Sequence, residues 1–133
     1  MIEIDLTGRV AVVTGGVQGI GRATATMLHR AGASVAINYY DDEGGLSRLR
    51  ADEVAELLGD RGFVLPADVR SRPDMEQFFS AVQSKFGRID FLVNNAAILR
   101  DRTVKNLTDE EWNSVIETNL SSVFRVCQAA LAH

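Results

Sequence analysis

A glycine-rich turn between a β-branched apolar run and a helical pattern is the feature that most constrains the fold of this chain. The run Val10–Thr14 leads directly into Gly15-Gly16-Val17-Gln18-Gly19-Ile20-Gly21. A strand so uniformly apolar is typical of a parallel sheet buried on both faces. Because glycine lacks a Cβ, a ligand can approach the turn closely, and the helix behind it directs free N–H groups at an anion. The stretch therefore predicts a phosphate-binding strand–turn–helix unit.

The glycine spacing separates this turn from two other phosphate-binding patterns. The G-x-x-x-G-x-G pattern that ends at Gly21 is neither the G-x-G-x-x-G fingerprint nor a P-loop. Gly16 and Gly21 have the P-loop gap, but Arg22 and Ala23 stand where lysine and then serine or threonine would hold phosphate and magnesium. We expect no ATP or GTP site, and a turn without any ligand is the alternative on this stretch alone.

Composition narrows the class of protein. A chain of 133 residues is the size of one domain and can bury a core, and a formal charge of −4 offers no footprint for nucleic acid or an anionic membrane. The single cysteine, Cys127, excludes an internal disulfide and fits a reducing compartment. No apolar run has membrane-spanning length, and the first residues do not form a leader. We expect a cytoplasmic protein without nucleic-acid or membrane partners and without a metal site.

Apolar periodicity alternates between strand and helix along the chain. The predicted strands are 10–14, 34–38, 63–65 and 89–93, and the predicted helices are 20–31, 46–58, 73–86 and a long one from 109 onward. This β-α-β-α-β-α-β-α order with short connections predicts a parallel sheet with helices on both faces and right-handed crossovers. The fold class is therefore α/β, a Rossmann-like doubly wound sheet with strand order 3-2-1-4, of which the chain holds the first half.

The helical faces are predicted from spacing. One face of the first helix combines Ile20, Ala23, Thr24, Met27 and Leu28. The period of the second helix rests on Leu46, Leu49, Val54, Leu57 and Leu58. His29 is expected on the exposed face of the first helix, and Cys127 is expected to be a buried apolar residue.

The last helical pattern opens with a capping box, Thr108-Asp109-Glu110-Glu111, and is still apolar at Leu131 without a C-cap. A doubly wound sheet usually has two halves. We therefore expect residues 1–133 to be a single incomplete domain, truncated before strand five of a larger one. Alone, it would expose a sheet edge at strand four and apolar surface on its last helix, so we expect it to be marginally stable or to aggregate.

Polar or small residues follow each predicted strand, where open α/β sheets bind ligands. After the glycine turn come Tyr39-Tyr40-Asp41-Asp42, then Asp68-Val69, and then Asn94-Asn95-Ala96-Ala97. An acidic residue about 20 positions beyond the glycines would bind the ribose 2′-hydroxyl of NAD, and a basic one the 2′-phosphate of NADP. Asn119 lies on the apolar stripe of the last helix, where an unpartnered amide costs about 1–3 kcal/mol. A buried structural asparagine bonded to a neighbouring loop is the alternative to a functional one.

Together these motifs resemble the classical short-chain dehydrogenase/reductase family, and within it the 3-oxoacyl-[acyl-carrier-protein] reductases. The cofactor motif of the family is matched by Thr14-Gly15-Gly16-x-x-Gly19-Ile20-Gly21. Its Asn-Asn-Ala-Gly motif is matched by Asn94-Asn95-Ala96-Ala97, which departs at the last position. Asn119 matches the helix asparagine of the catalytic tetrad.

The resemblance implies NAD(P)(H)-dependent hydride transfer between a nicotinamide and a carbonyl or secondary alcohol, with 3-oxoacyl reduction as one case, in a parent homotetramer. Asn119 would support a proton-relay water. The implied cofactor-binding residues are Thr14, Gly15, Gly16, Gln18, Gly19, Ile20, Gly21, Tyr39, Tyr40, Asp68, Val69, Asn95, Ala96 and Ala97. The cofactor would be NADP(H) or NAD(H). The family's aspartate is missing at Tyr39, which favours NADP(H), although Asp41 and Asp42 could oppose a 2′-phosphate.

The rest of the family's tetrad is not matched. Its catalytic tyrosine is followed four residues later by lysine, whereas Tyr39 and Tyr40, the only tyrosines, are followed by Glu43 and Gly44. We therefore expect the 133-residue chain alone to be inactive. The alternatives to a fragment of a reductase are a non-catalytic dinucleotide-binding or interaction module and an inactive partner that completes its sheet with another chain.

Overall fold

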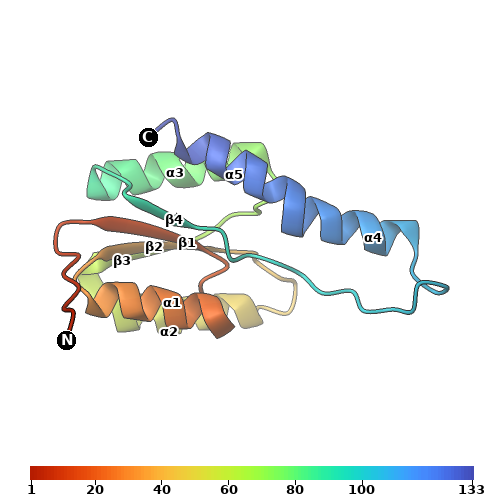
Figure 1. Cartoon of the computed structure of the whole chain (residues 1–133), viewed down its shortest axis with the longest axis horizontal. Coiled ribbons are helices and arrows are strands. Elements are labelled where there is room, and N and C mark those ends of the chain that lie inside the picture. The colour runs from red at the N-terminus through yellow and green to blue at the C-terminus, as the bar shows by residue number, and fades with distance from the viewer.

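The computed structural model describes all residues from 1 to 133 and contains one four-stranded parallel sheet (Figure 1). The strands are β1 (Val10–Thr14), β2 (Ser34–Tyr39), β3 (Gly62–Pro66) and β4 (Phe91–Val93). Their order across the sheet is β3-β2-β1-β4, and every neighbouring pair is parallel. The predicted fold class and strand order are confirmed.

Helices cover both faces of the sheet, and one helix extends beyond it. The helices are α1 (Gly19–Arg30), α2 (Leu46–Leu58), α3 (Arg72–Phe86), α4 (Asp109–Ile116) and α5 (Ser122–Ala130). Figure 1 shows α1 and α2 on one face, α3 and α5 on the other, and α4 projecting away at the end of a long connection from β4. No helix is both long enough and apolar enough to cross a membrane.

The strand β1 separates two apolar clusters. Val12 packs with Phe79 of α3 in one cluster, and Val13 packs with Ile37 of β2 in the other. All five residues of β1 are buried, as expected for a central parallel strand covered on both faces. The carboxyl end of β1 is thus fixed rigidly at the middle of the sheet.

The predicted faces of the first two helices need correction. Small residues, Gly21 and Ala25 of α1 and Ala51 of α2, face the sheet, while Ile20 and Met27 are exposed. Of the apolar residues predicted to set the period of α2, Val54 and Leu58 are buried, and the exposed ones are Leu46, Leu49 and Leu57. The reason is steric, because a Cβ on Gly21 would lie 2.6 Å from the Gly15 carbonyl oxygen. Only a face of small residues allows α1 to approach this closely.

His29 also differs from its prediction. Its side chain is half-buried, and Nε2 lies 2.9 Å from the Leu58 carbonyl oxygen at the end of α2. The contact joins α1 to α2 rather than leaving the imidazole in solvent. Cys127 is only partly buried, and the Asn94 amide lies 3.4 Å from its sulfur.

The last helix is not one continuous α-helix. It begins with the predicted capping box, in which Thr108 Oγ1 accepts from the Glu111 N–H at 3.1 Å and the Glu111 carboxylate accepts from the Thr108 N–H at 3.1 Å. A π-helical segment, Glu117–Ser121, then separates α4 from α5. A π-helical turn contains more residues than an α-helical turn, so the side chains that follow it face the sheet at different sequence positions. In α5 the apolar Phe124 is 65% exposed while Ser122 is buried.

Candidate functional site

A cavity of about 560 Å³ opens at the carboxyl ends of all four strands. It is lined by every predicted cofactor-binding residue except Thr14 and Gly16. The lining also includes residues that were not predicted from the sequence, namely Val17, Asn38, Ser47, Ala67, Arg70, Ile98, Arg100 and Thr118. The fold therefore brings together four segments that lie far apart in the chain.

The glycines of the first turn serve two different purposes. A Cβ on Gly16 would lie 2.8 Å from Ile37, so Gly16 is required by packing against β2 and does not line the cavity. Gly19 has a φ of +56°, lines the cavity and has no heavy atom within 4 Å of where a Cβ would stand. Gly19 is thus the position where the backbone is open to a ligand.

The N-terminus of α1 is free to bind an anion. Gln18, its N-cap, makes no side-chain capping bond, and no acidic residue occupies the first turn. The start of α3 differs, because Ser71 accepts from the Asp74 N–H there, and α4 has its capping box. Gly19, Ile20 and Gly21 line the cavity. Unsatisfied N–H groups and the positive end of the helix dipole therefore meet the cavity at its glycine wall.

Asn38 is a functional-site residue that the sequence reasoning missed. Its side chain is 1% exposed, its Oδ1 accepts from the Gly15 N–H at 3.2 Å, and its Nδ2 donates to the Ala67 carbonyl at 2.9 Å. The amide thereby links the glycine turn to the loop after β3. An asparagine at the end of an otherwise apolar buried strand was the available signal, since a buried amide requires partners.

Thr14 and Asn95 connect the glycine turn to the end of β4. Thr14 Oγ1 accepts from the backbone N–H groups of Asn95 and Ala96, each at 3.0 Å. Asn95 Nδ2 donates to the carbonyls of Thr14 at 3.0 Å and Gly15 at 3.2 Å. Thr14 consequently positions the cavity wall without lining the cavity itself.

Asn119 lies in the π-helical segment and is bonded to the loop after β4. Its Oδ1 accepts from the Ile98 N–H at 2.8 Å, and its Nδ2 donates to the Ile98 carbonyl at 2.9 Å. The partner loop matches the structural interpretation of this residue, but the side chain is exposed rather than buried. The paired bonds fix Ile98, which lines the cavity, to the last helix.

Thr118, next to Asn119, carries an unused hydroxyl. The residue is 6% exposed and lines the cavity, and its Oγ1 has no hydrogen-bond partner. A buried hydroxyl without a partner costs free energy, so native structures rarely leave one unsatisfied. A polar group bound in the cavity would satisfy it.

An ion pair forms the wall beyond β3. Arg70 holds the Asp68 carboxylate with two donors, Nη2 to Oδ2 at 2.7 Å and Nε to Oδ1 at 3.0 Å. Partial burial raises the pKa of Asp68, but the hydrogen bonds and charge of Arg70 outweigh this and bring the pKa below its usual value. The Arg70 guanidinium also lies 5.4 Å from the centre of the Tyr40 ring. Asp68 and Arg70 are therefore both charged at neutral pH, and together they give this wall no net charge.

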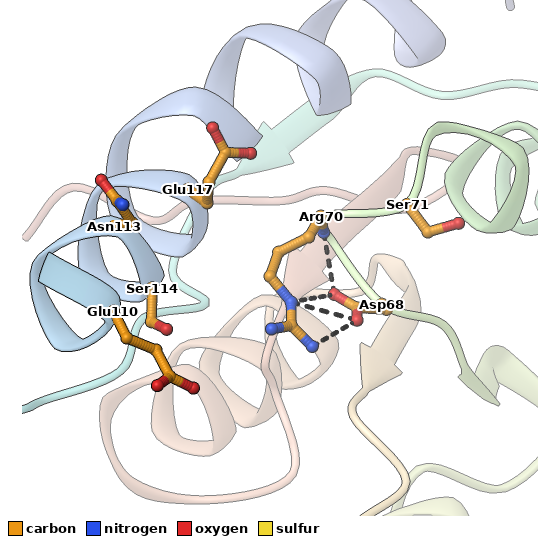
Figure 2. Close-up of a pocket in the computed structure, with 7 residues that line it drawn as sticks. All are labelled: Asp68, Arg70, Ser71, Glu110, Asn113, Ser114 and Glu117. Carbon is orange, nitrogen blue, oxygen red and sulfur yellow. Dashed lines mark hydrogen bonds and ion pairs between the residues drawn. The ribbon is translucent and has the colours of Figure 1, made fainter.

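A second cavity of about 670 Å³ lies on the other side of this pair (Figure 2). Figure 2 shows the Arg70 side chain between Asp68 and the last helix, while the Ser71 side chain points away from that helix. The last helix contributes Glu110, Asn113, Ser114 and Glu117. Carboxylates outnumber the one arginine, so this cavity suits a phosphate poorly. The glycine-lined cavity is the one whose donors fit an anionic dinucleotide.

The comparisons with known proteins agree with this geometry. The family model for short chain dehydrogenase matches residues 9–133. The chain is 41% identical over 128 residues to the 3-oxoacyl-[acyl-carrier-protein] reductase FabG of Escherichia coli K12, covering 96% of this chain and 50% of that protein. It is 37% identical over 127 residues to the corresponding reductase of Synechocystis, again covering 96% and 50%. The chain spans about half the length of the curated relatives it matches.

Solved structures give the same picture. A Brucella melitensis short-chain dehydrogenase/reductase described as glucose/ribitol dehydrogenase superposes with a TM-score of 0.89 at 33% identity. The superposition covers 98% of this chain and 54% of that one. A mutant short-chain dehydrogenase/reductase of Serratia marcescens gives a TM-score of 0.85 at 32% identity, with 96% and 51% covered.

Proposed function

The chain belongs to the short-chain dehydrogenase family, and on this premise we propose that its glycine-lined cavity binds a nicotinamide dinucleotide, NADP(H) or NAD(H). The observation that carries the proposal is the open N-terminus of α1 beside Gly19. Uncapped N–H groups, the absence of acidic residues in the first turn and a backbone open to solvent occur together there. These are the features that a pyrophosphate requires of a protein surface.

The residues of this chain would bind and orient the cofactor. The glycine turn would hold the pyrophosphate, the Asp68–Val69 wall would border the adenine, and Asn95 and Ala96 would border the ribose on the nicotinamide side. Thr118 offers an unpaired hydroxyl to a polar group of the ligand. Asn38 and Asn95 hold these walls in place through the bonds described above. When bound, the nicotinamide supplies the hydride chemistry of this protein family.

We place the chain in an oxidoreductase that transfers hydride between the nicotinamide and a carbonyl or secondary alcohol. Likeness to the FabG proteins supports a 3-oxoacyl thioester as substrate class. Asn119 would support a proton-relay water, for which its bonds to Ile98 hold the neighbouring loop. The proposal includes a cytoplasmic location, and a homotetramer that uses the exposed apolar side of α5 at Phe124 and the adjoining Leu131.

Residues 1–133 alone should bind without turnover. Tyr39 and Tyr40 are the only tyrosines, and neither precedes a lysine at the family spacing. General acid catalysis of carbonyl reduction requires a positioned proton donor, and neither tyrosine of this cavity has the lysine that accompanies the proton donor of the family. A non-catalytic dinucleotide-binding module makes the same prediction for the isolated chain. Oxidation of NADPH by the isolated chain with a 3-oxoacyl thioester would contradict both.

A pair of glycine substitutions tests the binding site. Gly19 and Gly59 have nearly the same φ, +56° and +57°, and both have open space where a Cβ would stand, but only Gly19 lines the cavity. Alanine at a positive φ costs about 1–2 kcal/mol in the left-handed region, and the cost is larger at Gly59, whose ψ is −142°. We expect Gly19→Ala to weaken binding of NADPH and NADH about tenfold or more, measured by calorimetry, because its methyl group occupies the ligand's approach.

Gly59→Ala is the matched control and should bind both dinucleotides as the unmodified chain does. Circular dichroism of the two variants would confirm equal helical content. If Gly19→Ala and Gly59→Ala lose binding affinity equally, the loss comes from a destabilised fold and not from the ligand's approach to Gly19. Failure of the unmodified, folded chain to bind either dinucleotide would overturn the proposed function.

A further inference from the structure

Two neutral residues of the cavity each contact a guanidinium from another element. Gln18, in the glycine turn, accepts a hydrogen bond at its Oε1 from Nη1 of Arg50 on α2. Tyr40, at the end of β2, lies under the guanidinium of Arg70. Arg70 is part of the cavity lining, whereas Arg50 contacts Gln18 from outside the lining.

The two arginines differ in how much of their charge is free. Arg70 is bound by the Asp68 carboxylate at 2.7 Å, which neutralises it. The arginines near Arg50 are paired with carboxylates too, Arg48 with Asp41 at 2.5 Å and Arg22 with Glu53 at 3.3 Å. Arg50 has no carboxylate within 4.0 Å. It is thus an uncompensated cation that is held by a neutral amide.

Arg50 lies next to the glycine-lined cavity. It lines an adjoining hollow of about 540 Å³ together with Val17, Gln18 and Gly19, and these three residues also line the main cavity. Ser47, one turn before Arg50 on α2, lines the main cavity itself. The three residues that line both cavities therefore form their shared wall, and Arg50 contacts Gln18 from the side of the smaller hollow.

The carboxylates at the end of β2 do not oppose an anion in this place. Asp41 is paired with Arg48, and the Asp42 carboxylate accepts from the Ser47 N–H at 3.2 Å. Neither aspartate lines the main cavity. Asp41 and Asp42 are thus not placed to accept the ribose hydroxyls of an unphosphorylated dinucleotide in this cavity.

From this arrangement, and resting on the proposed function, we infer that Arg50 is the residue that recognises the 2′-phosphate and gives the site its preference for NADP(H). A guanidinium fork matches phosphate oxygens in charge and geometry. Gln18 would act as a positioning residue that keeps the Arg50 side chain at the cavity wall. The selectivity would then come from α2, and not from a basic residue in the glycine turn or at the end of β2.

Two adenosine fragments isolate the phosphate in question. Adenosine 2′,5′-bisphosphate and adenosine 5′-monophosphate differ only in the 2′-phosphate. Calorimetry on the 133-residue chain should show the bisphosphate bound about tenfold or more tightly. Arg50→Gln should remove most of this preference while changing the affinity for the monophosphate by less than about twofold, since the monophosphate lacks the 2′-phosphate that Arg50 would bind and its 5′-phosphate would be held by the glycine turn. Arg50→Lys should keep part of the preference, because the charge remains without the fork.

Arg30→Gln is the matched control, because Arg30 is an exposed arginine at the far end of α1 that lines none of these cavities. It should leave both affinities unchanged. The inference is overturned if Arg50→Gln weakens the binding of both fragments equally or changes the binding of neither. It is also overturned if only Arg70→Gln loses the preference for the bisphosphate. Binding of the monophosphate without any preference refutes the role of Arg50 and leaves the proposed function intact. Binding of neither fragment refutes both.

Discussion

The two neighbours of β1 hold it in different ways. β2 pairs with all five residues of β1, is itself covered by β3, and buries Val35, Ala36 and Ile37 completely. β4 pairs with only three residues of β1, forms the edge of the sheet, and leaves Phe91 39% exposed. The central strand β1 thus has a fully buried neighbour, β2, on one side and a short, partly exposed edge strand, β4, on the other.

Polar contacts replace apolar burial on the β4 side. Asp90 accepts from the Val10 N–H at 2.8 Å, Thr14 accepts from the N–H groups of Asn95 and Ala96, and Asn119 binds Ile98 twice. These bonds hold the part of the cavity wall that follows β4. The wall on the β2 side therefore combines complete apolar burial with the two bonds of Asn38, whereas the wall on the β4 side rests mainly on a few directional bonds.

The largest effect is expected where packing dominates. Phe79 of α3 is fully buried against the sheet, whereas Phe124 of α5 is 65% exposed. Phe79→Ala should lower the free energy of unfolding by about 3–5 kcal/mol through lost burial and a cavity. Phe124→Ala, the same chemical change, should stay within about 0.5 kcal/mol. Urea unfolding followed by circular dichroism measures both.

Sedimentation at increasing concentration adds a second measurement to this pair. Phe124→Ala should reduce self-association, because it removes exposed apolar surface from α5. A loss of stability in Phe124→Ala as large as that in Phe79→Ala would show that α5 is packed in solution in a way this structure does not contain.

An intermediate effect is expected at the junction of the two walls. Thr14→Val keeps the shape of the side chain but leaves the N–H groups of Asn95 and Ala96 without their acceptor. The expected cost is about 1–3 kcal/mol, with faster amide hydrogen exchange at these two residues. Thr14→Ser keeps the hydroxyl and should retain slow exchange. Unchanged exchange in Thr14→Val would mean that the β4 wall does not depend on this bond.

The smallest effect is electrostatic and depends on pH. Hydrogen bonds from Arg88 lower the pKa of Asp90, with further lowering from the Val10 N–H, although desolvation opposes them. Because the pKa is lower in the folded state, the carboxylate stabilises the fold above its unfolded pKa of about 3.9, and this contribution is lost as the pH falls through the folded value. The effect is small because Arg88 is half-exposed.

Asp90→Asn should therefore be less stable than the unmodified chain near neutral pH, and the difference should shrink between about pH 5 and about pH 2. Unfolding midpoints measured across this range test the prediction. A difference that is constant with pH would show that the ionisation of Asp90 does not contribute to stability, and that β4 is held at Val10 by hydrogen bonding alone.

Local sequence patterns were sufficient for the outline of this molecule. The order of the elements, the parallel sheet and the position of the glycine turn follow from apolar periodicity, from the β-branched run Val10–Thr14 and from glycines where helices end. The capping box at Thr108 was equally readable, because its two bonds join residues only three positions apart. Such features are encoded within one or two turns of the chain.

Tertiary structure alone decided the rest. Apolar spacing favoured Ile20 and Met27 for contact with the sheet, but the short distance between α1 and the sheet admits only small residues such as Ala25. The π-helical segment around Asn119 left no periodic signal in the sequence. The bond of Thr14 to Asn95 spans 81 positions and that of Gln18 to Arg50 spans 32. Packing of the whole sheet brings these partners together, and no local pattern specifies contacts at such separations.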